Sequence, residues 1–108
     1  MNNWNLTDEI RNKFKPIVED YISLLESDKL NNEHRESIDF TNQGISPVQL
    51  KELLEELGYE EVDYDSNGWQ HDFWQYMNNP NREKYAKDLC IYGCGMTFDL
   101  ALGSDVDD

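Results

Sequence analysis

The spacing of apolar residues predicts a long helix near the N-terminus. From Leu6 to Leu25, apolar residues recur every three or four positions, which is the period of one buried helix face. Thr7 is the expected N-cap, and the helix is expected to end near Glu26 to Asp28. Pro16 lies inside the stripe and cannot donate a backbone hydrogen bond. We therefore expect a helix that kinks at Pro16 or breaks there into two shorter helices.

A second helix, over residues 46–58, is predicted from the residues at its ends. Ser46 is the N-cap, Pro47 takes the first helical position, and Gln49 completes a capping box. Four leucines form its apolar face, and Gly58 supplies the left-handed residue that ends it. We expect this helix to lie on a sheet and to have a mostly acidic outer surface.

The pattern then changes to the alternation of β-strands. A strand over residues 59–64 is expected to turn at Asp65–Gly68, where the Asn-Gly pair favours a hairpin. A second strand follows from Trp69 to Met77. Upstream of the second helix, residues 37–41 alternate weakly and predict an edge strand.

After a break at residues 78–81, an apolar tract runs from Leu89 to Leu102. Its interruption by Gly93-Cys94-Gly95 predicts either a hairpin turn or a bulge within one long strand. Alternation places five of its side chains on one face, namely Cys94, Met96, Phe98, Leu100 and Leu102. The chain as a whole predicts one α+β domain over residues 1–108, with helices packed on an antiparallel meander of three or four strands and a frayed acidic tail at 103–108.

The strand that ends at Met77 carries aromatic residues at both odd and even positions. A strand that is apolar on both faces is usually covered on both, yet the two helices can cover one face only. We therefore expect the face that carries Trp74 or Trp69 to be partly exposed, as a binding patch or a homodimer interface. The alternative is that all these aromatic residues belong to the core.

Charge sets the chain apart from most domains of its size. It has 108 residues, with 23 acidic residues against 9 Lys and Arg, and a formal net charge of −14. Such a surface repels phosphates, which argues against direct binding to nucleic acid or an anionic membrane. A hydrophobic content of 38% favours a folded chain. We see no signal peptide and no run of the ~18 apolar residues that a membrane span needs, so we expect a cytoplasmic protein.

The most motif-like string is the run from Asp63 to Gly68, which matches the opening of a calcium-binding EF-hand loop. Asp63, Asp65 and Asn67 would be its ligands. The twelfth position of such a loop should be a bidentate Glu, but it is Trp74 here. A hairpin turn explains the same residues, so calcium binding is the weaker reading.

Zinc binding and catalysis find less support. Cys90, Cys94, His34 and His71 do not have the spacing of a zinc site. The two cysteines are expected to be thiols, with a disulfide between them as the alternative. No nucleophile elbow or phosphate-binding loop occurs. We expect no enzyme activity and no cofactor.

The acidic residues concentrate between Ser46 and Asp65, where seven carboxylates accompany one lysine. Carboxylates four residues apart on a helix stand ~5–6 Å apart, the same order as the charge spacing along a nucleic-acid strand. The predicted partner-binding residues are those carboxylates and two nearby aromatic residues, Glu52, Glu55, Glu56, Glu60, Glu61, Asp63, Asp65, Trp74 and Tyr76. They predict a basic protein partner, such as the nucleic-acid-binding groove of a nuclease.

In size, charge and compactness the chain is similar to two classes of small acidic α+β domains. One comprises phage-encoded nucleic-acid mimics that inhibit CRISPR or restriction nucleases, and the other comprises immunity proteins for nuclease toxins. This similarity implies a non-enzymatic inhibitor. The alternatives are a calcium-binding module and a domain whose charge only aids solubility.

Overall fold

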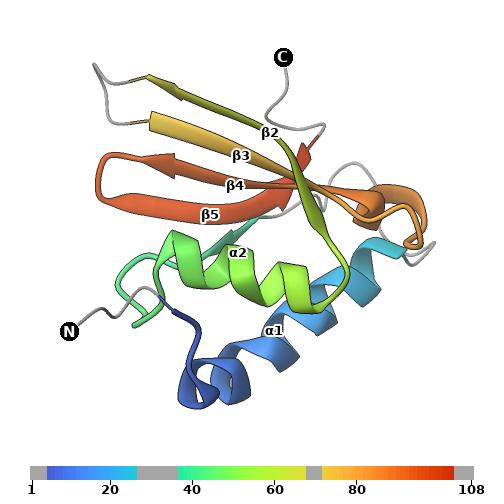
Figure 1. Ribbon diagram of the computed structural model, residues 1–108, viewed down its shortest axis with the longest axis horizontal. Coiled ribbons are helices and arrows are strands. Elements are labelled where there is room, and N and C mark those ends of the chain that lie inside the picture. The colour runs from blue at the N-terminus through green and yellow to red at the C-terminus, as the bar shows by residue number, and fades with distance from the viewer. Residues whose placement is uncertain (1–4, 27–36, 68–71, 104–108) are drawn as a thin grey trace.

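The computed structural model describes residues 5–26, 37–67 and 72–103. Within these ranges the chain forms an α+β fold in which two α-helices lie on one side of a five-stranded antiparallel sheet of order β1-β5-β4-β3-β2 (Figure 1). The elements are α1 Asp8–Glu26, β1 Ile38–Asp39, α2 Pro47–Glu56, β2 Glu60–Asn67, β3 Asp72–Asn78, the 3-10 helix η2 Lys84–Lys87, β4 Asp88–Cys94 and β5 Thr97–Leu102.

The helix α1 begins as predicted but does not break. The Ile10 N–H donates to the Thr7 hydroxyl oxygen at 3.2 Å, which confirms the N-cap. The helix continues through Pro16, so the prediction of two shorter helices is wrong. Phe14 and Val18 are buried on either side of the proline. Their packing on the core holds the helix together despite one missing backbone hydrogen bond.

Both ends of α2 confirm the prediction. The Ser46 hydroxyl accepts from the Gln49 N–H at 3.2 Å, and the Gln49 side chain accepts from the Ser46 N–H at 2.9 Å. At the other end Gly58 has φ +96°, and the Tyr59 N–H donates to the Leu54 carbonyl at 3.0 Å. This is a Schellman ending, which needs a residue at positive φ.

The meander has four strands, within the predicted three or four, but the whole sheet has five. The strands β2 to β5 follow one another in the sheet, and β1 adds a fifth strand at the edge of β5, where residues 37–41 predicted an edge strand. The turn expected at Asp65–Gly68 is wrong for its first three residues, because β2 runs on to Asn67, which pairs with Asp72. Pairing with β3 outweighs the turn preference of the local sequence. The predicted strand residues 69–71 and the tail 104–108 lie outside the described residues.

The glycine-rich interruption is a hairpin turn rather than a bulge. Cys94 pairs with Thr97, and Gly95 and Met96 form the two-residue loop, with Gly95 at φ +65°. The prediction that Cys94 and Met96 share a face with Phe98 is therefore wrong. Met96 is 92% exposed in the turn, and Cys94 lies across from Thr97 on the opposite face. Reversal of the chain, not continued alternation, sets these positions.

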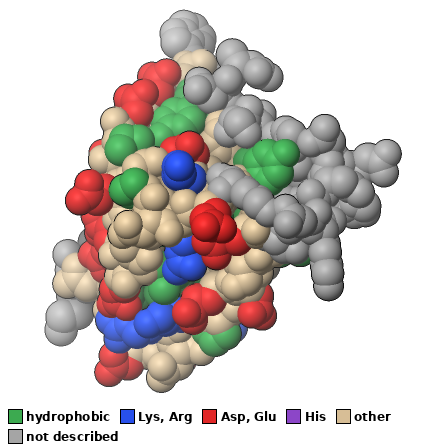
Figure 2. All heavy atoms as spheres, turned by 90° about the vertical axis from the view of Figure 1, so that its right-hand side faces the viewer, with side chains coloured by type: hydrophobic (Ala, Val, Ile, Leu, Met, Phe, Trp, Pro, Cys, Tyr) green, Lys and Arg blue, Asp and Glu red, His purple; other side chains and the backbone are tan. Residues whose placement is uncertain are grey.

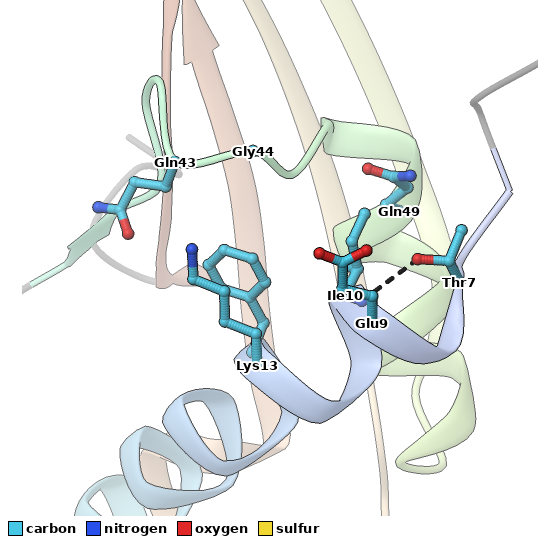
Figure 3. A pocket seen from close by; sticks show the side chains of 8 residues that line it. Thr7, Glu9, Ile10, Lys13, Gln43, Gly44 and Gln49 are labelled. Atoms are coloured by element: carbon cyan, nitrogen blue, oxygen red, sulfur yellow. Dashed lines mark hydrogen bonds between the residues drawn. The ribbon is translucent and has the colours of Figure 1, made fainter.

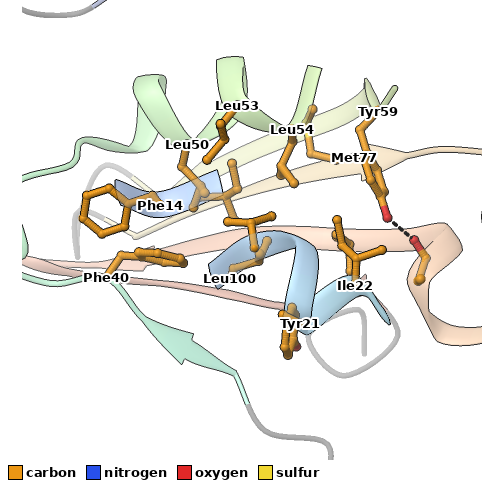
Figure 4. Packing of buried hydrophobic residues seen from close by; sticks show 14 of the residues in the cluster. Phe14, Tyr21, Ile22, Phe40, Leu50, Leu53, Leu54, Tyr59, Met77 and Leu100 are labelled. Atoms are coloured by element: carbon orange, nitrogen blue, oxygen red, sulfur yellow. Dashed lines mark hydrogen bonds between the residues drawn. The ribbon is translucent and has the colours of Figure 1, made fainter. Parts of the chain in front are cut away.

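The core lies between the two helices and one face of the sheet (Figure 4). Phe14 of α1 packs edge-to-face on Phe40, with ring centroids 5.8 Å apart. The leucines of α2 contact the same cluster. At the far end, the buried Tyr59 hydroxyl donates to the carbonyl oxygen of Ala86 in η2. That bond fastens the segment after α2 to the 3-10 helix, which the sequence pattern did not predict.

Candidate protein-binding face of the sheet

One face of the sheet is covered by the helices, and among the described residues no helix covers the other. Strand alternation turns Phe73, Gln75 and Met77 of β3 toward the helices and Trp74 and Tyr76 to the opposite face. Met77 is 1% exposed, whereas Trp74 and Tyr76 are half-buried. The two-sided aromatic pattern of this strand therefore leaves aromatic side chains on a helix-free face.

The strand register assembles a row of side chains across the helix-free face. Asp65 of β2 pairs with Trp74, Trp74 with Tyr92 of β4, and Tyr92 with Asp99 of β5. Asp99 in turn pairs with Asp39 of β1. The row spans about 19 Å, because neighbouring strands lie ~4.8 Å apart. The rings of Trp74 and Tyr92 are 5.7 Å apart between centroids and tilted by 39°. We call these five residues the acid–aromatic row.

A β-bulge places the carboxylates of β2 on this face. Glu61 pairs with Met77 on the helix side, and the register then shifts by one residue, so that Asp63 pairs with Tyr76. Asp65 follows Asp63 by two positions and shares its face. If Val62 instead took a regular place in the ladder, strand alternation would turn both aspartates toward the helices.

All charge within the strands is negative. The five described strands contain no Lys or Arg. Figure 2 shows Asp and Glu side chains at several places from top to bottom of the left-hand side of the molecule, with Lys and Arg in its middle and lower parts. The described basic residues belong to the helices and to the segment around η2. The helix-free face therefore combines an aromatic centre with acidic margins.

At one end of the row two carboxyl groups lie side by side. The Thr41 N–H donates to Asp39 at 2.8 Å, and the Ser37 hydroxyl donates to Asp99 at 3.3 Å. Hydrogen bonds from Thr41 lower the pKa of Asp39. Burial, followed by the charge of Asp39, raises the pKa of Asp99. Like charges directly opposite each other destabilise a sheet, so the fold holds this pair at a cost in stability.

The exposed edge of the sheet is β2, and its backbone groups can be assigned from the register. Phe40 donates its N–H to the Phe98 carbonyl. In an antiparallel sheet, the N–H and C=O of one residue face one neighbour and those of the next residue face the other. We apply this alternation from Phe40 across the sheet, strand by strand. It points the N–H and C=O of Trp74 toward β2, and it points those of Tyr64 and Ser66 toward the open edge.

The outward N–H groups of this edge are already occupied. The Tyr64 N–H donates to the carboxylate of Asp63, and the Ser66 N–H donates to that of Asp65, each at 2.9 Å. An added strand would need these donors. Asp63 and Asp65 therefore hinder strand addition at this edge.

The predicted carboxylates of α2 are separated from this face. Glu56 accepts three hydrogen bonds from Arg11 of α1, at 2.7, 2.8 and 3.1 Å, which lower the pKa of Glu56. Glu52 accepts from the Leu6 N–H at 2.6 Å, and Glu55 lies 3.4 Å from the Lys51 ammonium. The contacts of Glu56 and Glu52 join α2 to α1 and to the N-terminal segment, and the contact of Glu55 lies within α2. Of the predicted set, Glu60, Asp63, Asp65, Trp74 and Tyr76 lie on the helix-free face, whereas Glu61 bonds Gln75 on the helix side.

The two cysteines also lie on the helix-free face, in β4. Cys90 is buried and Cys94 is exposed, and both are thiols. They are four residues apart in one strand, about 13 Å, which is too far for a disulfide. A hydrogen bond and the charge of Asp72 raise the pKa of Cys94. Within the described residues, the Asp72 Oδ1 atom is buried without a hydrogen-bond partner.

The calcium motif does not take the shape of a loop. Asp63, Asp65 and Asn67 lie on the extended strand β2, where alternate side chains stand in a line ~6.6 Å apart instead of converging on one point. The described part of the chain contains no group of three or more His, Cys, Asp or Glu that could hold a metal ion. His34 and His71 lie outside the described residues.

A groove of about 430 Å³ lies on the helix layer, between the first turns of α1 and the start of α2. Figure 3 shows Lys13 of α1 and Gln43 of the loop before α2 on the left of the view, with Gln49 of α2 to the right. Its two ionisable residues, Glu9 and Lys13, have opposite charges. This groove is separate from the acid–aromatic row.

Sequence reasoning missed three members of the row, Tyr92, Asp99 and Asp39. A signal for Tyr92 was present, because it alternates with Leu89 and Ile91 in β4 and so faces away from the core. No local signal links Asp99 or Asp39 to Trp74, since their proximity depends on the order of the strands.

Comparison with known proteins found no matching family model, no matching curated protein and no matching solved structure. Among the described helices, none is both long and apolar enough to cross a membrane.

Proposed function

We propose that this protein is a non-enzymatic inhibitor that docks its helix-free sheet face on a basic, nucleic-acid-binding surface of another protein in the cytoplasm. The observation that carries the proposal is the acid–aromatic row, in which an aromatic centre lies between acidic margins. Protein interfaces commonly combine an aromatic core with a polar rim. A nuclease of a phage-defence system, or a nuclease toxin, is the partner class that this chemistry favours.

The spacing of the margins supports mimicry of nucleic acid. Asp63 and Asp65 stand ~6.6 Å apart along β2. Asp99 lies three strands away, about 14 Å from Asp65, at the opposite margin. The two aspartates of β2 and the single Asp99 across the sheet have a separation close to that of phosphates on either side of a DNA groove, which is ~12 Å wide on the major side. A surface that binds phosphates can therefore receive both margins.

The test is capture of the partner from a lysate of the source cells on the immobilised protein, with a NaCl gradient for elution and mass spectrometry for identification. We expect a nucleic-acid-binding protein that elutes at moderate salt and is displaced by excess duplex DNA or RNA. Its nucleic-acid binding or cleavage should fall when this protein is added.

The decisive variant is Asp63→Asn with Asp65→Asn, because the Asn side-chain oxygen can still accept the edge N–H groups while two charges are lost. We expect elution of the same partner at lower salt. The matched control is Glu19→Gln with Asp20→Asn, which removes two charges from exposed positions of α1. Equal elution from both variants would refute the proposal. Retention of nothing at low salt would favour the solubility reading.

A further inference from the structure

We propose that the helix-free face receives an arginine side chain of the partner over the Trp74–Tyr92 pair, and that it discriminates arginine from lysine there. The inference rests on the proposed function and deepens it, since it names the group at the centre of the contact. It follows from three observations: the charge of the face, its aromatic geometry, and the poor fit of a second copy or an added strand.

Charge complementarity selects a cation. The described strands carry acidic residues and no basic ones, so nothing on these strands neutralises the face from within. Asp65 and Asp99 lie directly beside Trp74 and Tyr92, respectively, in the sheet register. Directly opposite residues have Cβ atoms ~4.5–5.5 Å apart. A cation above either ring is therefore within reach of a carboxylate.

The aromatic centre selects arginine among cations. A guanidinium group is flat, stacks on aromatic faces and is less strongly hydrated than an ammonium group. Trp74 and Tyr92 present neighbouring rings with centroids 5.7 Å apart, both half-buried. Beside Tyr92, Asp99 and Asp39 form a pair of carboxyl groups that a forked donor can bridge. Lysine offers a point charge, which gains less from either feature.

Two other occupants fit the face less well. A second copy would set acidic margins against acidic margins, and packed sheets lie only ~10 Å apart, which is about one Debye length in 0.1 M salt. An added strand at β2 would have to displace the Asp63 and Asp65 carboxylates from the N–H groups that they occupy. A basic surface that projects arginine meets neither obstacle.

The probes are two blocked hexapeptides, Ac-GRGRGR-NH2 and Ac-GKGKGK-NH2, titrated into the full-length protein at low salt by calorimetry and by NMR. We expect the arginine peptide to bind with a Kd about fivefold lower than that of the lysine peptide. The NMR signals of the Trp74 indole and the Tyr92 ring should shift with the arginine peptide. Equal Kd values, or no shift at these two rings, would overturn the inference.

Variants separate the contribution of the aromatic rings to peptide binding from that of the charges. Trp74→Leu with Tyr92→Leu keeps an apolar surface without aromatic faces, so the two peptides should bind about equally. Asp99→Asn should weaken binding of the arginine peptide. The fold should become no less stable, because the substitution relieves the like-charge contact with Asp39. Glu19→Gln with Asp20→Asn is again the charge control, and it should keep the preference for arginine.

The outcomes distinguish this inference from the proposed function. A preference for arginine that survives the double leucine variant would overturn the inference. If the double leucine variant does not fold, Asp99→Asn and the wild-type ring shifts still decide the question. If the inference fails but capture of the partner still depends on Asp63 and Asp65, the proposed function stands without the arginine contact.

Discussion

Gly93→Ala is expected to destabilise the fold through one identifiable contact. Gly93 of β4 lies opposite Phe73 of β3, and the ring occupies the space that a side chain would fill. An alanine Cβ would lie 2.0 Å from Phe73 Cε1 and 2.6 Å from Cδ1. Carbon atoms in contact keep ~3.5 Å apart, so the ring has to move by about 1.5 Å. Tyr64, which stacks on the other side of Phe73 with centroids 6.3 Å apart, loses part of its contact.

The magnitude follows from three opposing effects. Overpacking costs about 1–3 kcal/mol, and a disturbed aromatic pair costs about 0.5–1.5 kcal/mol. Replacing glycine in a strand by alanine stabilises the fold by about 0.5–1 kcal/mol through the lower backbone entropy of the unfolded chain. Because Phe73 is half-buried and can swing outward, we expect a net loss of roughly 1–2 kcal/mol. That corresponds to a fall in Tm of roughly 5 °C or more for a chain of this length.

The assay is urea unfolding of four proteins: the wild type, Gly93→Ala, Phe73→Ala and the double variant. Without the ring, the three closest contacts of an alanine Cβ at position 93 are gone. We expect it to be neutral or stabilising by up to about 1 kcal/mol in the Phe73→Ala background. The reasoning is refuted if Gly93→Ala costs the same free energy of unfolding in both backgrounds.

Three further predictions concern other parts of the molecule. Ser46→Ala should cost about 1 kcal/mol in urea unfolding, because it removes the N-cap of α2. Tyr59→Phe should cost about 1 kcal/mol through its lost buried hydrogen bond. Burial raises the pKa of Tyr59 to about 12, whereas an unfolded tyrosine ionises near pH ~10. The wild type should therefore lose stability as pH rises through this window, and the Phe variant should lack that loss. Asp72→Asn should lower the pKa of Cys94 and speed its alkylation by iodoacetamide at pH 8, with buried Cys90 as the unreactive reference.

The helix-free face illustrates how far sequence reasoning reaches. Alternation in one strand was enough to predict that Trp74 and Tyr76 lie opposite Met77. It was not enough to choose the acidic residues beside them. The charge of Glu56 suggested a binding residue, but Arg11, which is distant in sequence, donates hydrogen bonds to it. A carboxylate that is paired within the fold looks the same in the sequence as one that is available to a partner.

The bulge at Val62 has the largest consequence of any feature that the sequence did not reveal. Glu61, Asp63 and Asp65 have the same parity along the chain, and simple alternation assigns them to one face. The extra residue in β2 leaves Glu61 on the helix side and turns the two aspartates to the other. A one-residue shift reverses every later side chain, because the period of a strand is two.

The sequence by itself determined the features that depend on near neighbours along the chain. These are both α-helices with their caps, the sidedness of β3 and the excess of negative charge. Only the tertiary structure decided the acid–aromatic row, whose members Asp39, Asp65, Trp74, Tyr92 and Asp99 come from five different strands. Helix caps and periodicity rest on bonds between residues a few positions apart. A row across a sheet depends on strand order, the bulge and the hairpin register together, and these depend on pairing between distant segments.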